Sequence, residues 1–182
     1  MKRRYKKVTI NLAGILLILV IIVLNNLGYI ELKKENLKNV EKESSNKKLY
    51  LVKRVVDGDT FVVNFDGTDE KVRLIGVDTP ESVHKDKSKN TKEGKIASNY
   101  TTEKIQNKQV ELEFDVQQRD KYGRILAYVY IDGNMLNKML LEDGMAKLAT
   151  YPPNVKYVED FKKLQAEARK NNVGFWNGIY SK

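Results

Sequence analysis

The chain has 182 residues, 41% hydrophobic and 31% charged, which is the composition of a globular protein with room for one ordinary domain and an appendage. It contains no cysteine, which excludes disulfides, thiol nucleophiles and thiolate metal sites. Of the formal net charge of +9, residues 1–24 carry +5, residues 25–48 carry +2 and residues 49–182 carry +2. The charge is concentrated near the N-terminus, so it does not by itself indicate nucleic-acid binding.

The N-terminal segment has the pattern of a membrane anchor or a signal peptide. Five of the first seven residues are basic, and an apolar run of seventeen residues follows from Val8 to Leu24. As a helix this run would be about 26 Å long, within the usable range for a hydrocarbon core of roughly 30 Å. The basic flank should stay in the cytoplasm, which places everything after Leu24 outside. Because no small-x-small cleavage pattern follows, we expect residues 1–24 to form an uncleaved anchor rather than a cleaved signal peptide.

Residues 25–48 are rich in Lys, Glu and Asn, which predicts a solvated linker. The folded domain is expected at residues 49–182, where short β-branched runs begin. Five strands are predicted, at residues 49–56, 60–65, 71–77, 109–114 and 124–131. Turns are predicted beside them at three Asp-Gly pairs, Asp57-Gly58, Asp66-Gly67 and Asp132-Gly133.

Helical patterns occupy residues 92–106, 134–143 and 154–171, to within a residue or so. In the last of these, apolar residues recur every three or four positions and should pack on the sheet. They are Val155, Val158, Phe161, Leu164 and Ala168. Together these elements predict an α+β fold that is mainly β, a partly open five-stranded Greek-key barrel with three packed helices.

Two carboxylates flank a glycine between the first two predicted strands, in Asp57-Gly58-Asp59. An Asp-Gly pair alone indicates a turn. The second aspartate places both carboxylates near one end of the sheet, where hard oxygen ligands could bind a calcium ion. From these residues alone, a simple turn and a metal site both remain open.

Arg73 lies in a predicted strand that is apolar on both faces, so its guanidinium should be buried and paired with a carboxylate or a phosphate. A purely structural ion pair is the alternative. The strand should end at Asp78-Thr79-Pro80-Glu81, because Pro80 removes a donor and biases Thr79 toward an extended backbone. The two acids would then point out of the strand end, although ordinary loops have the same composition.

A polar turn, Asp120-Lys121-Tyr122-Gly123-Arg124, enters the last predicted strand. On its own it is compatible with a hairpin turn that carries solvated charges. Together with the preceding motifs it brings two arginines and three acids to strand ends. Phosphodiester cleavage needs this combination, with cations for the phosphate charge and oxygens for a metal.

Three segments, DGDT, RLIGVDTPE and DKYGR, resemble in their order and approximate spacing the signature segments of the staphylococcal (micrococcal) nuclease family. The resemblance extends from about Leu49 to Trp176. It implies an oligonucleotide-binding (OB) fold barrel with three helices. It also implies a calcium-dependent phosphodiesterase that acts on DNA and RNA and releases 3′-phosphate ends.

The resemblance further implies which residues bind the metal. Asp59 and Asp78 would bind calcium through their side chains, and Thr79 through its backbone carbonyl. Asp57 would support the site at longer range. The implied cofactor is therefore Ca²⁺, held by oxygen ligands only.

The remaining roles implied by the resemblance concern the water and the substrate. Glu81 would orient or deprotonate the attacking water. Arg73 and Arg124 would hold the phosphate and stabilise the charge of its transition state. Lys121 and Tyr122 would contact the phosphates of the nucleotide.

The sequence departs from the family pattern in one place that touches substrate binding. The family's type member has two tyrosines separated by one residue before a Lys-Pro, whereas residues 149–153 read ATYPP here and are one residue shorter. Tyr151 matches the second tyrosine, which stacks on the base, and the first is absent. The adjacent prolines permit a cis bond at Pro153.

The segment from His84 to Lys95 contains five lysines against two acids, and Gly94 should supply flexibility. It could steer polyanions toward the site, or it could be a mobile solvated loop. His84 is the only histidine, and we expect it to be a loop residue without a catalytic role.

An enzyme is expected because all the acids and both arginines are present together. A non-catalytic nucleic-acid-binding module of the same fold is the main alternative. A surface adhesion protein on a membrane stalk would leave the buried arginine and the clustered acids unexplained. We expect a monomer with DNA and RNA as substrates. It would be held at the cell membrane through residues 8–24 with its C-terminal domain outside, or secreted if the N-terminal segment is cleaved.

Overall fold

The structure is a computed structural model that describes residues 12–26, 28, 48–83 and 85–178. The chain divides into two units, residues 1–47 and 48–182, which are described separately. In the first unit, α1 (Leu12–Asn26) is a mainly aliphatic helix whose side chains are exposed from Ile15 to Leu24. No helix within the described ranges is long and apolar enough to cross a membrane. Most of the predicted linker lies outside the described residues.

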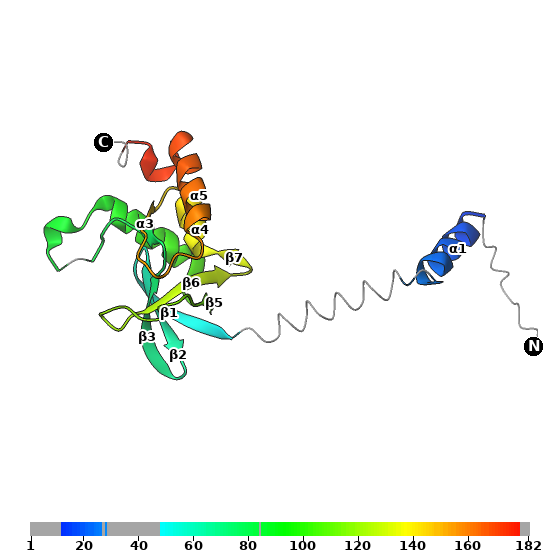
Figure 1. Cartoon of the computed structure of the whole chain (residues 1–182), viewed down its shortest axis with the longest axis horizontal. Coiled ribbons are helices and arrows are strands. Elements are labelled where there is room, and N and C mark those ends of the chain that lie inside the picture. The colour runs from blue at the N-terminus through cyan, green and yellow to red at the C-terminus, as the bar shows by residue number, and fades with distance from the viewer. Residues whose placement is uncertain (1–11, 27, 29–47, 84, 179–182) are drawn as a thin grey trace, which may run out of the picture. The chain divides into compact units, whose positions relative to one another are not determined.

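Five strands of the second unit form a closed barrel (Figure 1). Strands β1 (Leu49–Asp57), β2 (Thr60–Phe65) and β3 (Thr68–Leu74) form an antiparallel meander, and β5 (Gln109–Glu113) pairs with β1. Strand β6 (Ile125–Ile131) pairs antiparallel with β5 and parallel with β3. The five-stranded barrel is confirmed, and the β3–β6 pairing closes it where a partly open barrel was expected.

The predicted third strand, residues 71–77, is divided in two. Strand β3 ends at Leu74, and β4 (Val77–Asp78) begins a new pairing with β8 (Lys147–Leu148). Gly76 lies between them with a φ of 78°, a left-handed value that glycine adopts readily and that interrupts the strand. This turn brings Asp78 back toward the end of β3.

All three Asp-Gly pairs lie at hairpin turns as predicted. In the first, β1 and β2 pair at Asp57 and Thr60, so Gly58 and Asp59 form the turn. Asp66 and Gly67 have φ values of 52° and 89°, and Asp132 and Gly133 have values of 50° and 79°. Two consecutive positive φ values define the type I′ turn that suits the twist of a hairpin. The hairpin at Asp132-Gly133 joins β6 to the short strand β7 (Asn134–Met135).

Three helices pack on the barrel. Helix α3 (Lys92–Ile105) contacts β1, whereas α4 (Leu136–Glu142) contacts both β6 and α5 (Val158–Lys170). Short 3-10 helices, η1 (Lys87–Lys89) and η2 (Gly174–Trp176), complete the elements of the second unit.

The apolar stripe predicted for the last helix is confirmed in part. Phe161 and Ala168 are buried, and Leu164 packs against the core. Val155 was expected in the stripe, but it is 46% exposed and precedes the helix, which begins only at Val158. Asn154 lies in the loop before the helix, where its backbone forms a bridge with Tyr151 and its side chain is hydrogen-bonded to the backbone of Gln117.

Aliphatic and aromatic side chains from the strands and helices fill the core. Those at most 2% exposed include Val52, Phe61, Val63, Val72, Ile105, Val110, Ile125, Val129, Leu140 and Phe161. Full burial of one such side chain stabilises a fold by about 1.5–3 kcal/mol. The strand ends that carry the polar motifs are therefore anchored in a well-packed interior.

Candidate active site

Strand register brings the predicted site residues to one end of the barrel. Thr60 of β2 lies opposite Arg73 of β3, and Arg73 lies opposite Leu126 of β6. Asp59 directly precedes β2, and Arg124 directly precedes β6, so both reach the same end as Arg73. The pairing that closes the barrel thus also brings the two arginines to one cavity.

Arg73 is paired with two carboxylates. Its Nη1 lies 2.8 Å from Asp59 Oδ2, and its Nη2 lies 2.9 Å from Asp78 Oδ1. Nη1 also donates to the Val77 carbonyl at 2.8 Å. Because only 13% of the side chain is exposed, the guanidinium needs these partners to offset its desolvation. The pairing predicted for this arginine is confirmed, with carboxylates as the partners.

Asp59 joins the β1–β2 turn to the segment that follows β4. Its Oδ2 accepts hydrogen bonds from the Thr79 backbone N–H at 3.0 Å and from the Thr79 hydroxyl at 3.2 Å. Burial raises the pKa of Asp59, and the Arg73 guanidinium and the Thr79 N–H act against that rise. A cation beside this carboxylate would likewise favour its ionised form.

Asp57 is held behind the turn. Its Oδ1 accepts hydrogen bonds from the Gly58 N–H at 2.9 Å and from the Ser82 hydroxyl at 2.6 Å. A Cβ on Gly58 would lie 2.7 Å from Thr79 Oγ1 and 2.9 Å from Ala97 Cβ. Glycine is therefore required here for close packing and not for a positive φ. Sequence reasoning missed Ser82, since a single loop serine carries no distinguishing pattern.

The N-terminus of α3 holds the backbone of Glu81. The Thr91 N–H donates to the Glu81 carbonyl at 2.9 Å, and the Thr91 hydroxyl caps the helix by accepting from the Gly94 N–H at 2.9 Å. A Cβ on Gly94 would lie 2.1 Å from the Glu81 carbonyl oxygen. Gly94 lies in helix α3 and permits a close contact between that helix and the backbone of Glu81. The role in loop flexibility that was expected for Gly94 is therefore wrong. The Glu81 side chain is exposed.

The turn before β6 orients Arg124 through Asp120. Oδ2 of Asp120 accepts from Arg124 Nε at 2.7 Å, and its Oδ1 accepts from the backbone N–H groups of Tyr122 and Arg124. Burial acts against ionisation of Asp120, but these hydrogen bonds lower its pKa overall. Neither Nη group of Arg124 has a hydrogen-bond partner among the described residues. Asp120 was not among the predicted site residues, although aspartate at a turn start commonly makes such bonds.

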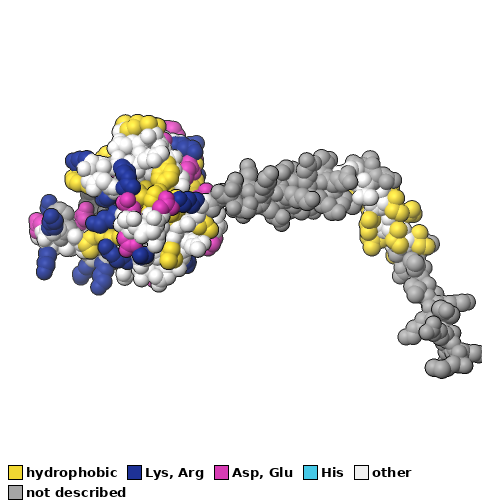
Figure 2. Space-filling model, turned by 90° about the horizontal axis from the view of Figure 1, so that it is seen from below, with side chains coloured by type: hydrophobic (Ala, Val, Ile, Leu, Met, Phe, Trp, Pro, Cys, Tyr) yellow, Lys and Arg dark blue, Asp and Glu magenta, His cyan; other side chains and the backbone are white. Residues whose placement is uncertain are grey.

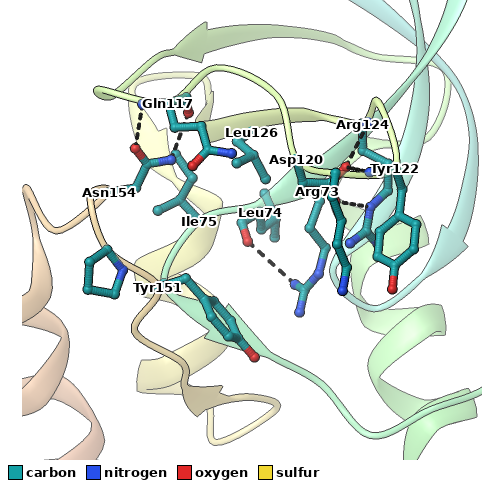
Figure 3. A pocket seen from close by; sticks show the side chains of 13 residues that line it. Arg73, Leu74, Ile75, Gln117, Asp120, Tyr122, Arg124, Leu126, Tyr151 and Asn154 are labelled. Atoms are coloured by element: carbon teal, nitrogen blue, oxygen red, sulfur yellow. Dashed lines mark hydrogen bonds and ion pairs between the residues drawn. The ribbon is translucent and has the colours of Figure 1, made fainter.

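Most of the predicted site residues line two adjoining hollows. A cavity of about 200 Å³ is lined by the acids and arginines, Asp57, Asp59, Asp78, Glu81, Arg73 and Arg124. A pocket of about 490 Å³ shares both arginines and is lined also by Lys121, Tyr122 and Tyr151 (Figure 3). In the view of Figure 3 the Arg73 guanidinium projects between the rings of the two tyrosines. Of the predicted site residues only Thr79 lies beneath these surfaces, where it is buried.

Tyr151 lies at the pocket with 70% of its surface exposed. Its loop is fixed by Asn154, whose Oδ1 accepts from the Gln117 N–H at 2.7 Å and whose Nδ2 donates to the Gln117 carbonyl at 2.7 Å (Figure 3). The cis bond that the adjacent prolines permit is present between Pro152 and Pro153. Asn154 is a third residue that sequence reasoning missed, after Ser82 and Asp120.

The predicted ligands offer only oxygen atoms, which is the donor chemistry that suits a calcium ion. Within the described ranges, no group of three or more Asp, Glu or His side chains is arranged to hold a metal. The predicted ligand set needs only two carboxylates, Asp59 and Asp78, with the Thr79 carbonyl. Both carboxylates contact the Arg73 guanidinium, so they lie close to each other. Calcium takes about six to eight oxygen ligands, and waters can supply those that the protein does not. His84 lies outside the described residues.

Comparison with known proteins identifies the family. The sequence model described as "Staphylococcal nuclease homologue" matches residues 71–178. The chain is 43% identical over 174 residues to the Thermonuclease of Staphylococcus intermedius, across 94% of this chain and 98% of that protein. It is 39% identical over 172 residues to the Thermonuclease of Staphylococcus hyicus, across 94% of this chain and 99% of that protein. It is 42% identical over 126 residues to the SPbeta prophage-derived endonuclease YokF of Bacillus subtilis, across 68% of this chain and 42% of that protein. The chain therefore belongs to the staphylococcal nuclease family.

Proposed function

We propose that the chain is a calcium-dependent nuclease that hydrolyses phosphodiester bonds of DNA and RNA and leaves 3′-phosphate ends. Relatives named thermonuclease and endonuclease support the nuclease activity. The observation that carries the proposal is the 200 Å³ cavity where four acids meet Arg73 and Arg124. Oxygen ligands for a metal and guanidinium groups for a phosphate are what this reaction requires.

Asp59, Asp78 and the Thr79 carbonyl would hold the calcium ion. When bound, calcium supplies positive charge beside the scissile phosphate. Arg73 is oriented by the same two carboxylates. Its guanidinium would therefore lie next to that phosphate. Asp57 supports this arrangement from behind, because its hydrogen bond from Ser82 ties the turn to the loop.

Glu81 accepts the proton of the attacking water. Its exposed side chain lines the cavity, where water can reach it. The water oxygen bonds to phosphorus and the bond from phosphorus to the 5′-oxygen breaks. That oxygen takes up a proton from solvent water to become a hydroxyl, and the phosphate stays on the 3′-oxygen. Glu81 then returns its proton to the solvent. Arg73 and Arg124 stabilise the charge that develops on the phosphate oxygens.

Arg124 is suited to bidentate phosphate binding. Asp120 holds its Nε at 2.7 Å, which fixes the direction of the guanidinium plane. The two Nη groups remain available, and a planar fork matches two phosphate oxygens. The adjoining 490 Å³ pocket would take the nucleotide, with Lys121 and Tyr122 at its phosphate and Tyr151 at its base.

The test is incubation of the purified full chain with single-stranded DNA and with RNA, in calcium, in magnesium and in excess chelator. Cleavage is expected in calcium, weakly in magnesium, and not in chelator, since the oxygen-rich site suits the larger ion. The products should resist extension by a polymerase until a phosphatase removes the 3′-phosphate. Binding of nucleic acid without cleavage would instead favour a non-catalytic module.

We also propose that residues 8–24 hold the catalytic domain at the outer face of a membrane. Five basic residues precede this apolar run, and aliphatic side chains of α1 are exposed along it. Protease added to intact cells should then remove the C-terminal domain. A domain protected until the cells are broken would contradict this location.

A further inference from the structure

A second groove adjoins the active-site cavity and is not lined by Tyr151. Its volume is about 490 Å³, and it is lined by Lys71, Glu81, Val83, Lys85, Tyr122 and Arg124. It shares Lys71, Glu81, Val83 and Arg124 with the catalytic cavity, and Tyr122 and Arg124 with the Tyr151 pocket. The three hollows therefore form one tract, with Arg124 common to all of them.

Two lysines give this groove its positive charge. Lys71 lies on β3 two residues before Arg73, so both side chains project from the same face of the strand. Lys85 lies in the segment that follows Glu81. Both lysines are exposed, and neither ammonium group has a carboxylate partner among the described residues. An ammonium group without an internal counter-ion is available to a phosphate.

The positive charge continues beyond Lys85. Exposed lysines follow along η1 and the start of α3, namely Lys87, Lys89, Lys92 and Lys95. Figure 2 shows Lys and Arg side chains gathered at the left of the folded domain, the end at which Figure 1 places this segment. The groove thus opens from the catalytic cavity toward a basic surface. The positive charge of this surface would attract a polyanion.

The substrate must continue past the phosphate that is cut. A strand that presents one phosphate to the two arginines has a nucleoside on each side of it, and the Tyr151 pocket accounts for one. We propose that the second groove binds the nucleotide on the other side of the scissile phosphate. Lys71 and Lys85 bind the next phosphate along the strand. This inference rests on the proposed nuclease function.

The size and lining of the groove agree with such an occupant. Its volume falls within the roughly 300–1,000 Å³ of ordinary ligand sites. Val83, which is 56% exposed, offers an apolar surface to a sugar or base, and the exposed ring of Tyr122 separates the groove from the Tyr151 pocket. Neither contact selects a particular base, so the subsite should accept any sequence.

The experiment uses a thymidine dinucleotide with one cleavable phosphodiester, either unmodified or carrying a terminal phosphate at its 5′ or 3′ end. A terminal phosphate adds charge without adding a diester to cut. The gain in kcat/KM from each phosphate is measured for the wild-type full chain, for a Lys71→Gln/Lys85→Gln double variant and for Lys121→Gln. Lys170→Gln, in the last turn of α5, is the matched control for a lost charge.

The gain from one terminal phosphate should fall roughly threefold to tenfold in the double variant, as expected for lost charge-assisted contacts. The gain from the other terminal phosphate should fall only in Lys121→Gln, and Lys170→Gln should change neither. An unchanged gain at both ends in the double variant would overturn the subsite, as would an equal loss in Lys170→Gln. Failure of the wild type to cut any nucleic acid in calcium would instead remove the proposed nuclease function itself.

Discussion

At the scale of single residues, the two arginines of the cavity have different surroundings. Arg73 is 13% exposed and is shared between Asp59 and Asp78. Arg124 is 30% exposed, donates its Nε to Asp120 and lies with its guanidinium carbon 5.5 Å from the centre of the Tyr122 ring. The first arginine therefore contributes to folding as well as to the site, whereas the second is held in place but remains open toward a ligand.

This difference predicts different consequences of replacing each arginine by lysine, which keeps the charge but loses the fork. Arg124→Lys should lower kcat by about 10²–10³ with little change in stability. Arg73→Lys should lower both kcat and the affinity for substrate, and also the free energy of unfolding, by about 1–3 kcal/mol. Steady-state kinetics and thermal unfolding separate these effects, with the exposed Arg54→Lys as the control. Near wild-type turnover for Arg124→Lys would contradict its assigned role.

At the scale of elements, the N-terminus of α3 is a support for Glu81. The helix begins with a threonine cap and a glycine whose missing side chain leaves room for the Glu81 carbonyl. The Thr91 N–H then holds that carbonyl at 2.9 Å. The proposed general base is thus carried on a loop, but the loop backbone is fixed by a helix that packs on β1.

Gly94→Ala should displace Glu81, because the added Cβ would lie 2.1 Å from its carbonyl oxygen. We expect overpacking to cost about 1–3 kcal/mol of stability and kcat to fall more than KM rises. Asn99→Ala, at an exposed position of the same helix, is the matched control. Unchanged kcat in a folded Gly94→Ala protein would show that this contact does not position the base.

A second support joins β5 to the start of α5. Glu113 accepts hydrogen bonds from the hydroxyls of Tyr130 at 2.7 Å and Tyr157 at 3.0 Å, and it pairs with Lys156. Burial of Glu113 would raise its pKa, but these partners outweigh burial and lower the pKa below its ordinary value of 4.5. The ionised carboxylate is therefore the form that the fold prefers.

A lowered carboxylate pKa contributes stability that is present above the unfolded-state pKa and is lost as pH falls through the folded-state value. Wild-type stability should accordingly exceed that of Glu113→Gln by about 1–2 kcal/mol at neutral pH. The difference should shrink as pH falls below 4.5. Urea unfolding of both proteins at a series of pH values measures it. A difference that does not change with pH would rule out the carboxylate charge as its cause.

At the scale of the whole molecule, one buried amide links the helices to the strand ends. Asn137 of α4 is fully buried, accepts from the Val129 N–H of β6 at 2.9 Å and donates to the Ile75 carbonyl at 2.8 Å. The Ile75 carbonyl belongs to the turn between β3 and β4, which carries Asp78 to the site. The core therefore determines the position of an active-site segment through a polar contact.

Asn137→Ala should lower the free energy of unfolding by about 2–4 kcal/mol, because it leaves a buried N–H and a buried carbonyl without partners. Denaturant unfolding measures the loss. Asn134→Ala, an exposed substitution in the neighbouring β7, is the control and should have little effect. A loss no larger than that of the control would mean that the contact does not stabilise the fold.

Local patterns were enough to predict most elements and their positions. Residues 60–65 form the predicted strand, and the Asp66-Gly67 and Asp132-Gly133 pairs form the hairpin turns that such dipeptides favour. The helix predicted at residues 92–106 is found at Lys92–Ile105. These features depend on neighbouring residues only, which is why periodicity and turn composition reveal them.

Features that depend on distant residues were not predicted. Closure of the barrel needs β3 and β6 to pair, and no local pattern in either strand specifies that partner. The loop before α5 is held by a contact between Asn154 and Gln117, which are 37 residues apart. Ser82 and Asn154 were overlooked for the same reason, since their partners Asp57 and Gln117 are distant in the sequence. Asp120 was overlooked although its partners are local.

We propose Glu81 as the base of a calcium-dependent phosphodiesterase, and the turnover of Glu81→Gln measures that role. Glutamine keeps the shape of the side chain but cannot accept the proton of water. With single-stranded DNA in calcium, kcat should fall by about 10²–10⁴, the usual contribution of a positioned general base. The affinity for DNA, measured on the same protein, should stay nearly unchanged. Near wild-type kcat for Glu81→Gln would contradict the proposed site, even if the protein still cut DNA.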